Sequence, residues 1–188
     1  MSAGADDVAA VAAAEEAAAA ADVTLDDVTK MSKVWHTVLS MLVDRGYHIP
    51  VEKLSLSLEA FRDQFAEADE SGKRSQVDED KLCIVARKAN DPTQSIMVFF
   101  FRGMKMGVDT LEDYSKRVEK ANCHSVIIVL YHSMTSQCHT KIREIELKLM
   151  CRIETFTESE LVVDITKHVL VPKHIVLSEQ EKREVLKR

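Results

Sequence analysis

The sequence predicts an α/β (α+β) fold built on a mixed β-sheet. Val126–Leu130 is an unbroken run of β-branched residues and leucine, which is typical of a strand buried on both faces. Apolar residues then recur at helical spacing, so an amphipathic helix should follow the strand and pack back on the sheet. These helix positions are Cys138, Ile142, Ile145 and Leu149. The polar turn between them, His132–Gln137, leaves the carboxyl end of the strand, where α/β proteins usually bind ligands.

Composition and charge exclude several classes of protein. The chain has 188 residues, of which 46% are hydrophobic, enough for one domain with a real core or for one domain and a smaller module. Residues 1–29 contain seven carboxylates and no Lys or Arg, so the total of −6 leaves +1 for the rest of the chain. A nearly neutral body lacks the basic field of a protein that binds nucleic acid over its whole surface.

The N-terminus carries no recognisable targeting signal. Residues 1–23 are alanine-rich with scattered acids and lack the basic start of a signal peptide and the arginines of a transit peptide. We expect a disordered acidic arm there, since alanine alone buries little surface. No run approaches the roughly 18 apolar residues of a membrane span. The four cysteines form no CxxC pair, which favours reduced thiols in the cytosol or nucleus.

Two helical regions are predicted before the first strands. A helix should open at Thr24, with Asp27 at the capping-box position, and end before Gly46. Its apolar stripe is Val28, Met31, Trp35, Val38 and Leu42, which makes Trp35 a core residue. A second helical region should start at Pro50. One face of that region carries Leu54, Leu58, Phe61 and Phe65.

A strand pair and a crossover helix should follow a polar loop at 69–80. Residues 81–89 and 95–101 form the strands, joined by the turn Asn90-Asp91-Pro92. A third helix should be capped by Thr110 with Asp113. Its inward positions are Leu111, Tyr114, Val118 and Ala121, and after the central strand and its helix the chain returns in extended form at Cys151–Phe156.

The pattern changes from Thr157 onward. Two β-rich runs and a proline-bounded turn precede a last helix, which the capping box Ser178-x-x-Glu181 should open. Too little apolar sequence follows to close a second core, so this segment needs a partner or further chain.

The spacing of residues predicts neither a catalytic site nor a metal site. There is no Ser–His–Asp or Cys–His arrangement, no GxGxxG and no Walker loop. Metal-dependent nucleases of mixed α/β type need an acid on one strand and E-x-K on the next, but 96–101 is wholly apolar. The triplets Glu79-x-Lys81 and Glu146-x-Lys148 lie before a strand and on a helix. Cys123, His124, His132, Cys138 and His139 match no zinc pattern, so we expect no metal, cofactor or small-molecule substrate.

The turn after the central strand is the strongest candidate site. Thr135 and Ser136 place hydroxyls at a helix N-terminus whose free N–H groups point outward, and Lys141 lies about one turn further on. This arrangement suits a phosphate oxygen without reading a base. Ordinary N-capping of the helix explains the same residues.

Several segments resemble the fifth common subunit of eukaryotic nuclear RNA polymerases. They are DRGY at 44–47, NDP followed by VFFF at 90–101, IIVLY followed by MTSQC at 127–138, and ETFTESELVVDITKHVLVPKHIVLSEQEKREVLKR from Glu154 to the end. The resemblance implies an N-terminal jaw domain at 24–155, with a nuclease-like fold but no active site, near downstream DNA. It also implies that 156–188 form a linker and the beginning of a C-terminal assembly module bound to the largest subunit.

The resemblance assigns roles to two sets of residues. A sequence-independent contact to downstream duplex DNA would use Thr135, Ser136, Gln137 and Lys141. A subunit interface would use His168, Leu170, Val171, Pro172 and His174. The expected protein is then a non-catalytic nuclear subunit with no membrane contact. The alternative is a free-standing α/β interaction module without DNA contact, and an enzyme is a third class.

Two features depart from the family pattern. The family loop reads M-T-P-S, whereas here Ser136-Gln137 follows Met134-Thr135, so the stiffening proline is missing. Family members also continue past the equivalent of Arg188, so we expect a fragment, a truncated gene product or a variant that docks differently.

Overall fold

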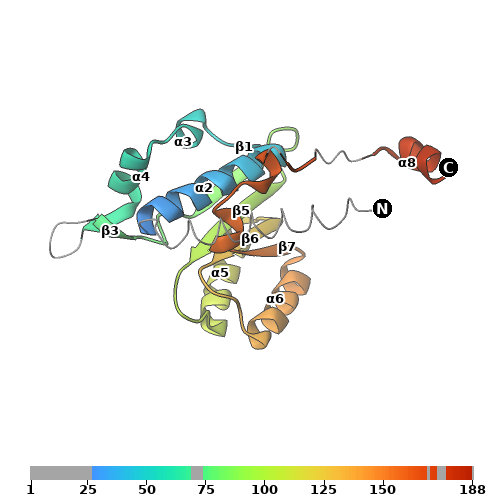
Figure 1. Cartoon of the computed structure of the whole chain (residues 1–188). Helices are drawn as coiled ribbons and strands as arrows, with labels where there is room; N and C mark the ends of the chain where they lie inside the picture. The colour runs from blue at the N-terminus through green and yellow to red at the C-terminus, as the bar shows by residue number, and fades with distance from the viewer. Residues whose placement is uncertain (1–26, 69–73, 169, 173–176, 188) are drawn as a thin grey trace, which may run out of the picture.

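The computed structural model describes the chain except residues 1–26, 69–73, 169, 173–176 and 188 (Figure 1). Its centre is a five-stranded sheet in the order β1-β4-β5-β6-β7. The strands are β1 (Tyr47–His48), β4 (Ile84–Lys88), β5 (Ser95–Phe101), β6 (Ser125–Leu130) and β7 (Arg152–Thr157). β4 pairs antiparallel with β1 and β5, whereas β5, β6 and β7 are parallel. The predicted mixed sheet is therefore confirmed.

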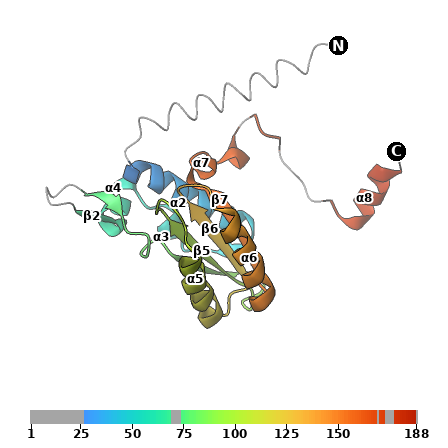
Figure 2. The ribbon, with the colours of Figure 1, turned by 90° about the horizontal axis from the view of Figure 1, so that it is seen from below.

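Helices cover both faces of the sheet (Figure 2). α2 (Asp27–Asp44) lies on one face with α7 (Glu158–Leu161), and α5 (Val108–Ala121) and α6 (Ser136–Leu149) lie on the other. β6 contributes to both cores: Ile127 and Val129 face α2, while Val126, Ile128 and Leu130 face α5 and α6. All five side chains are at most 3% exposed, which confirms a strand covered above and below.

The first helix buries the predicted stripe. All five of its predicted apolar residues are at most 1% exposed. Trp35 packs against Phe61 and Phe65 with ring centroids 5.6 and 5.4 Å apart, so it is a core residue as predicted. The helix ends at Asp44, and Gly46 takes a positive φ of 82°, which costs glycine little. The proposed cap Thr24 lies outside the described residues.

The second helical region is two short helices rather than one. The first, α3, covers Val51–Leu54. The second, α4 (Leu58–Phe65), begins as a separate helix because the Ser57 hydroxyl caps it, accepting a hydrogen bond from the N–H of Ala60 at 3.2 Å. As a result Leu54 and Leu58 are 37% and 39% exposed, although their spacing predicted a buried face.

The segment predicted as a polar loop contains a strand. β3 (Arg74–Val77) pairs antiparallel with β2 (Ala66–Ala68) as a separate two-stranded sheet. Val77 is 8% exposed and belongs to the core under α2, which gives this polar segment an apolar anchor.

The third helix starts earlier than predicted. Gly107 is its N-cap and Val108 its first residue, so Thr110 lies inside the first turn and the predicted cap is wrong. The chain is held just before the helix because Met106 is buried and its carbonyl accepts a hydrogen bond from the Cys138 thiol at 3.1 Å. Ala121, predicted to face inward, is exposed in the last turn.

The first β-rich run after Thr157 is helical instead. Thr157 and Glu160 form a capping box that opens α7, and the 3-10 helix η1 (Ile165–Lys167) follows. Glu158 and Leu161 are buried, so contacts with the sheet domain continue past 155, and the expected boundary after 155 falls within β7. Most of the second run lies outside the described residues. The capping box of Ser178 with Glu181 does open α8 (Glu179–Leu186), as predicted.

Met150 ends α6 in a strained conformation. Its φ is 50° and its ψ 38°, the left-handed region that favours glycine, and its side chain is 83% exposed. Met150→Gly should therefore stabilise the protein by about 1 kcal/mol in urea unfolding, because strain is relieved and little packing is lost. Leu147→Gly, at a 78% exposed position within the same helix, should instead destabilise it by about 1 kcal/mol. A loss of stability in Met150→Gly would contradict this account.

Candidate functional site

The loop between β6 and α6 leaves the edge of the sheet at which β5, β6 and β7 all end. Each strand is followed at this edge by a residue that takes part in one polar cluster: Arg102 after β5, Tyr131 after β6 and Glu158 after β7. Parallel pairing aligns the last residues of these strands, since Phe101 lies opposite Leu130 and Leu130 opposite Thr157.

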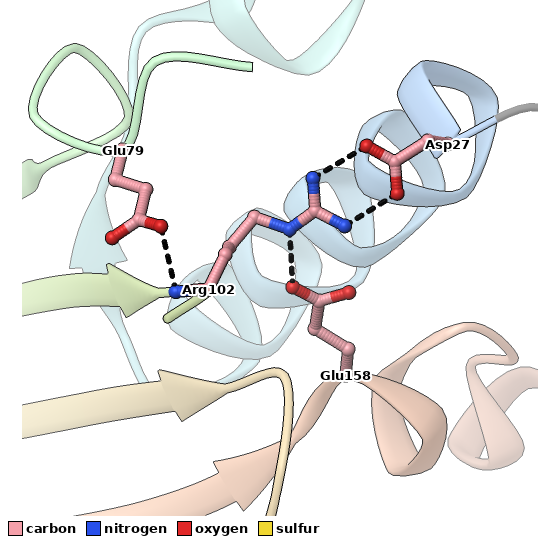
Figure 3. Close-up of polar contacts among 4 residues, drawn as sticks. All are labelled: Asp27, Glu79, Arg102 and Glu158. Atoms are coloured by element: carbon pink, nitrogen blue, oxygen red, sulfur yellow. Dashed lines mark hydrogen bonds and ion pairs between the residues drawn. The ribbon is translucent and has the colours of Figure 1, made fainter. Parts of the chain in front are cut away.

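Arg102 is the hub of this cluster (Figure 3). Its two terminal nitrogens donate to the carboxylate of Asp27 at 2.6 and 2.5 Å, and its Nε donates to Glu158 Oε1 at 2.8 Å. Its backbone N–H donates to Glu79 Oε1 at 2.8 Å. The arginine thus joins the start of α2, the end of β5, the start of α7 and the segment before β4.

Burial sets the electrostatics of the cluster. The side chain of Arg102 is 13% exposed and that of Glu158 only 2%. Burial alone would lower the pKa of Arg102, but hydrogen bonds and charge from Asp27 and Glu158 outweigh it and raise that pKa. Burial raises the pKa of Glu158 more than the charge and hydrogen bond of Arg102 and the charge of Lys30 lower it. Glu158 Oε2 accepts no hydrogen bond from the described residues.

Tyr131, the first residue of the loop, packs on two cations. The guanidinium of Arg102 lies 5.2 Å and the ammonium of Lys30 5.7 Å from the centroid of its ring. The ring of His132 meets Tyr131 edge-on, with centroids 4.5 Å apart. The start of the loop is therefore held against the polar cluster.

Thr135 is the N-cap of α6. Its hydroxyl oxygen accepts from the N–H of Cys138 at 3.4 Å and lies 3.3 Å from the Cys138 thiol. Ser136 and Gln137 are exposed in the first turn beside it. The structure thus shows the capping role and brings these three predicted residues together at the helix N-terminus.

Lys141 is not directed to the loop. Its ammonium pairs with Glu112 on α5 at 3.0 Å and with Glu144 at 3.6 Å. The hydrogen bond to Glu112 raises the pKa of Lys141, so its charge is retained but already compensated. Two cations that sequence reasoning missed, Arg102 and Lys30, lie at this edge against the ring of Tyr131. In the sequence, the signal that could have pointed to Arg102 was its position as a charged residue directly after the apolar run at 98–101.

The predicted interface residues form an exposed turn. The His168 carbonyl accepts a hydrogen bond from the N–H of Val171 at 3.0 Å. The Nδ1 of the His168 ring accepts one from the N–H of Leu170 at 3.3 Å. Leu170 is 73% exposed, Val171 is half-buried and Pro172 is exposed. His174 lies outside the described residues.

The glutamates of the two E-x-K triplets do not come together in one site. Glu79 accepts from the N–H of Arg102, and Glu146 Oε1 accepts from the N–H of Ile153 at 2.8 Å. Across the described residues, no cluster of three or more His, Cys, Asp or Glu is placed to hold a metal. No helix in that part of the chain is long and apolar enough to span a membrane.

Comparison with known proteins places these features in a family. The family "RNA polymerase Rpb5, N-terminal domain" matches residues 26–118 and "RNA polymerase Rpb5, C-terminal domain" matches residues 163–188. The subunit RPABC1 of DNA-directed RNA polymerases I, II and III from Caenorhabditis briggsae is 34% identical over 166 residues, covering 87% of this chain and 76% of that protein. The chain belongs to the RNA polymerase Rpb5 family.

Other relatives of this family align over a similar span. The DNA-directed RNA polymerase subunit 5-like protein 1 of Arabidopsis thaliana is 35% identical over 162 residues, covering 86% of this chain and 74% of that protein. The RPABC1 subunit of Dictyostelium discoideum is 32% identical over 164 residues, covering 87% of this chain and 76% of that protein. The resemblance to the common polymerase subunit is confirmed. The N-terminal match contains Arg102, and the C-terminal match contains Leu170 and α8.

Proposed function

We propose that this protein is a non-catalytic subunit of nuclear DNA-directed RNA polymerase that scaffolds the jaw and contacts downstream duplex DNA. The observation that carries the proposal is the match of both Rpb5 domains, in order, in one chain. The polar cluster supports a structural role, since Arg102 and its carboxylates bind one another and secure three elements.

The proposed partner is the largest polymerase subunit, bound through the C-terminal segment. Leu170 is 73% exposed on its turn, and α8 has no buried residue, with Val185 and Leu186 61% and 76% exposed. Apolar surface gathered in a short segment is typical of a protein interface. His168, Val171, Pro172 and His174 complete the proposed interface.

The proposed DNA contact is to phosphate and independent of base sequence. The exposed first turn of α6 offers N–H groups and the hydroxyl of Ser136, with Thr135 and Gln137 beside it. Since Lys141 is already paired with two glutamates, it should add little. The isolated protein should therefore bind DNA weakly, because few counterions are released, and the contact should gain strength only within the polymerase.

Footprinting of the assembled polymerase on a DNA scaffold tests this contact. Thr135→Ala with Lys141→Ala should weaken downstream protection without changing subunit assembly, and Thr135→Ala alone should account for most of the effect. Thr140→Ala with Lys148→Ala, two exposed residues of the same helix, is the matched control and should leave protection unchanged. Full downstream protection in the Thr135 and Lys141 variant would reduce the loop to a capped helix start.

A further inference from the structure

β7 forms one outer edge of the five-stranded sheet, because β6 is its only neighbour among the described strands. The N–H of Arg152, its first residue, donates to the carbonyl of His124 at the start of β6. Backbone groups alternate in direction along a strand, so the odd-numbered residues from 153 to 157 direct theirs away from the sheet. An edge of this kind is a template for pairing with another strand.

Carboxylates occupy two of the three outward N–H groups of this edge. The N–H of Ile153 donates to Glu146 Oε1, from α6, at 2.8 Å, and the N–H of Thr157 donates to Glu160 Oε2, from α7, at 2.6 Å. The N–H of Thr155, between them, has no hydrogen-bond partner within the part of the chain that the structure describes. Hydrogen bonds to a carboxylate are stronger than those to a neutral carbonyl, so an approaching strand has to displace them.

The outward groups of β7 match those of a second copy in one register. Two β7 strands that meet antiparallel, with Thr155 opposite Thr155 of the second copy, place Ile153 opposite Thr157 on both sides of the two-fold axis. Every outward N–H then has a carbonyl partner, including the two in each copy that Glu146 and Glu160 now occupy. All three outward residues are β-branched, which favours a strand.

We propose that Glu146 and Glu160 keep the β7 edge closed to pairing with a second copy of this chain. Both carboxylates are held in place by the structure around them. Glu146 is half-buried on α6, and Glu160 also accepts from the hydroxyl of Thr157 at 2.9 Å, in the capping box that opens α7. Neither forms an ion pair with a described residue, so no cation draws them from the backbone. The inference does not depend on the proposed polymerase role.

Sedimentation equilibrium of the whole chain tests the proposal. Glu146→Ala with Glu160→Ala should form dimers at least about tenfold more tightly than the parent chain, because two edge donors in each copy are freed. Glu146→Ala alone leaves the capping box of α7 intact and should show part of the effect. The matched control, Glu119→Ala with Glu184→Ala, removes the same charge from exposed positions on α5 and α8 and should change association less than about twofold.

A proline at the centre of the edge locates the contact. Proline has no N–H, and the N–H of Thr155 points away from β6, so Thr155→Pro removes the central donor of the pairing while the sheet keeps its own hydrogen bonds. Added to the double glutamate variant, it should return association to the level of the parent chain. Thr155→Ala, which keeps the N–H, should leave the dimer of the double variant in place.

Two results would overturn the proposal. The first is association of the double glutamate variant, and of Glu146→Ala alone, no tighter than that of the Glu119 and Glu184 control. The second is a dimer that survives Thr155→Pro, because its contact then lies on another surface. A melting curve of each variant restricts the comparison to folded protein.

Discussion

Arg102→Met is expected to destabilise the fold by about 3–5 kcal/mol, measured by urea unfolding, because it leaves buried Glu158 without the counter-charge that is hydrogen-bonded to it. Glu158 is 1% exposed and its only hydrogen-bond donor in the described part of the chain is Arg102. The substitution also removes the bidentate contact that holds the start of α2. A loss below about 1 kcal/mol would show that the cluster contributes little to stability.

The pH dependence of this loss has a defined sign. The pKa of Glu158 is raised in the folded protein, so its contribution to stability is greatest below its usual pKa and declines as the pH rises through the raised value. Without Arg102, the ionised form of Glu158 should be still less favourable in the folded protein. The variant should therefore come closest to the parent protein in acid, and adding Glu158→Gln should remove most of the loss at neutral pH. Equal loss at every pH would contradict this explanation.

Leu170→Asp with Val171→Asp should release the protein from the polymerase while leaving the sheet domain folded. Leu170 is 73% exposed and Val171 half-buried, so the change places charges in a proposed interface at little cost to the core. Co-purification with tagged polymerase measures release, and a melting curve measures folding. Leu147→Asp with Met150→Asp replaces exposed apolar residues at the end of α6 and should leave assembly intact. Normal assembly of the Leu170 variant would exclude this turn as the anchor.

The sheet could be predicted because its evidence is local. The apolar run of β6, the turn at 90–92 and the stripe of α2 each identify an element within a few residues of sequence. The break between α3 and α4 was missed because apolar spacing continues across it, while the Ser57 cap decides the outcome. β3 was missed because three of its four residues are polar and its pairing with β2 is set by tertiary contact.

The candidate site could be predicted only in outline. A strand running into a helix is enough to place Thr135 and Ser136 at a helix N-terminus. The partners of Arg102 lie 75 and 56 residues away in sequence, and no local pattern links them. The pairing of Lys141 with Glu112 likewise depends on how α5 and α6 pack together, which periodicity does not specify.

Gradient co-sedimentation with nuclear RNA polymerase tests the central claim most directly. A tagged form of this protein, expressed in its own cells, should sediment with the two large polymerase subunits, and quantitative mass spectrometry should find it in equal amount to the largest one. Sedimentation of the protein as a free species, with no large polymerase subunit in its fractions, would contradict the account and favour a free-standing interaction module.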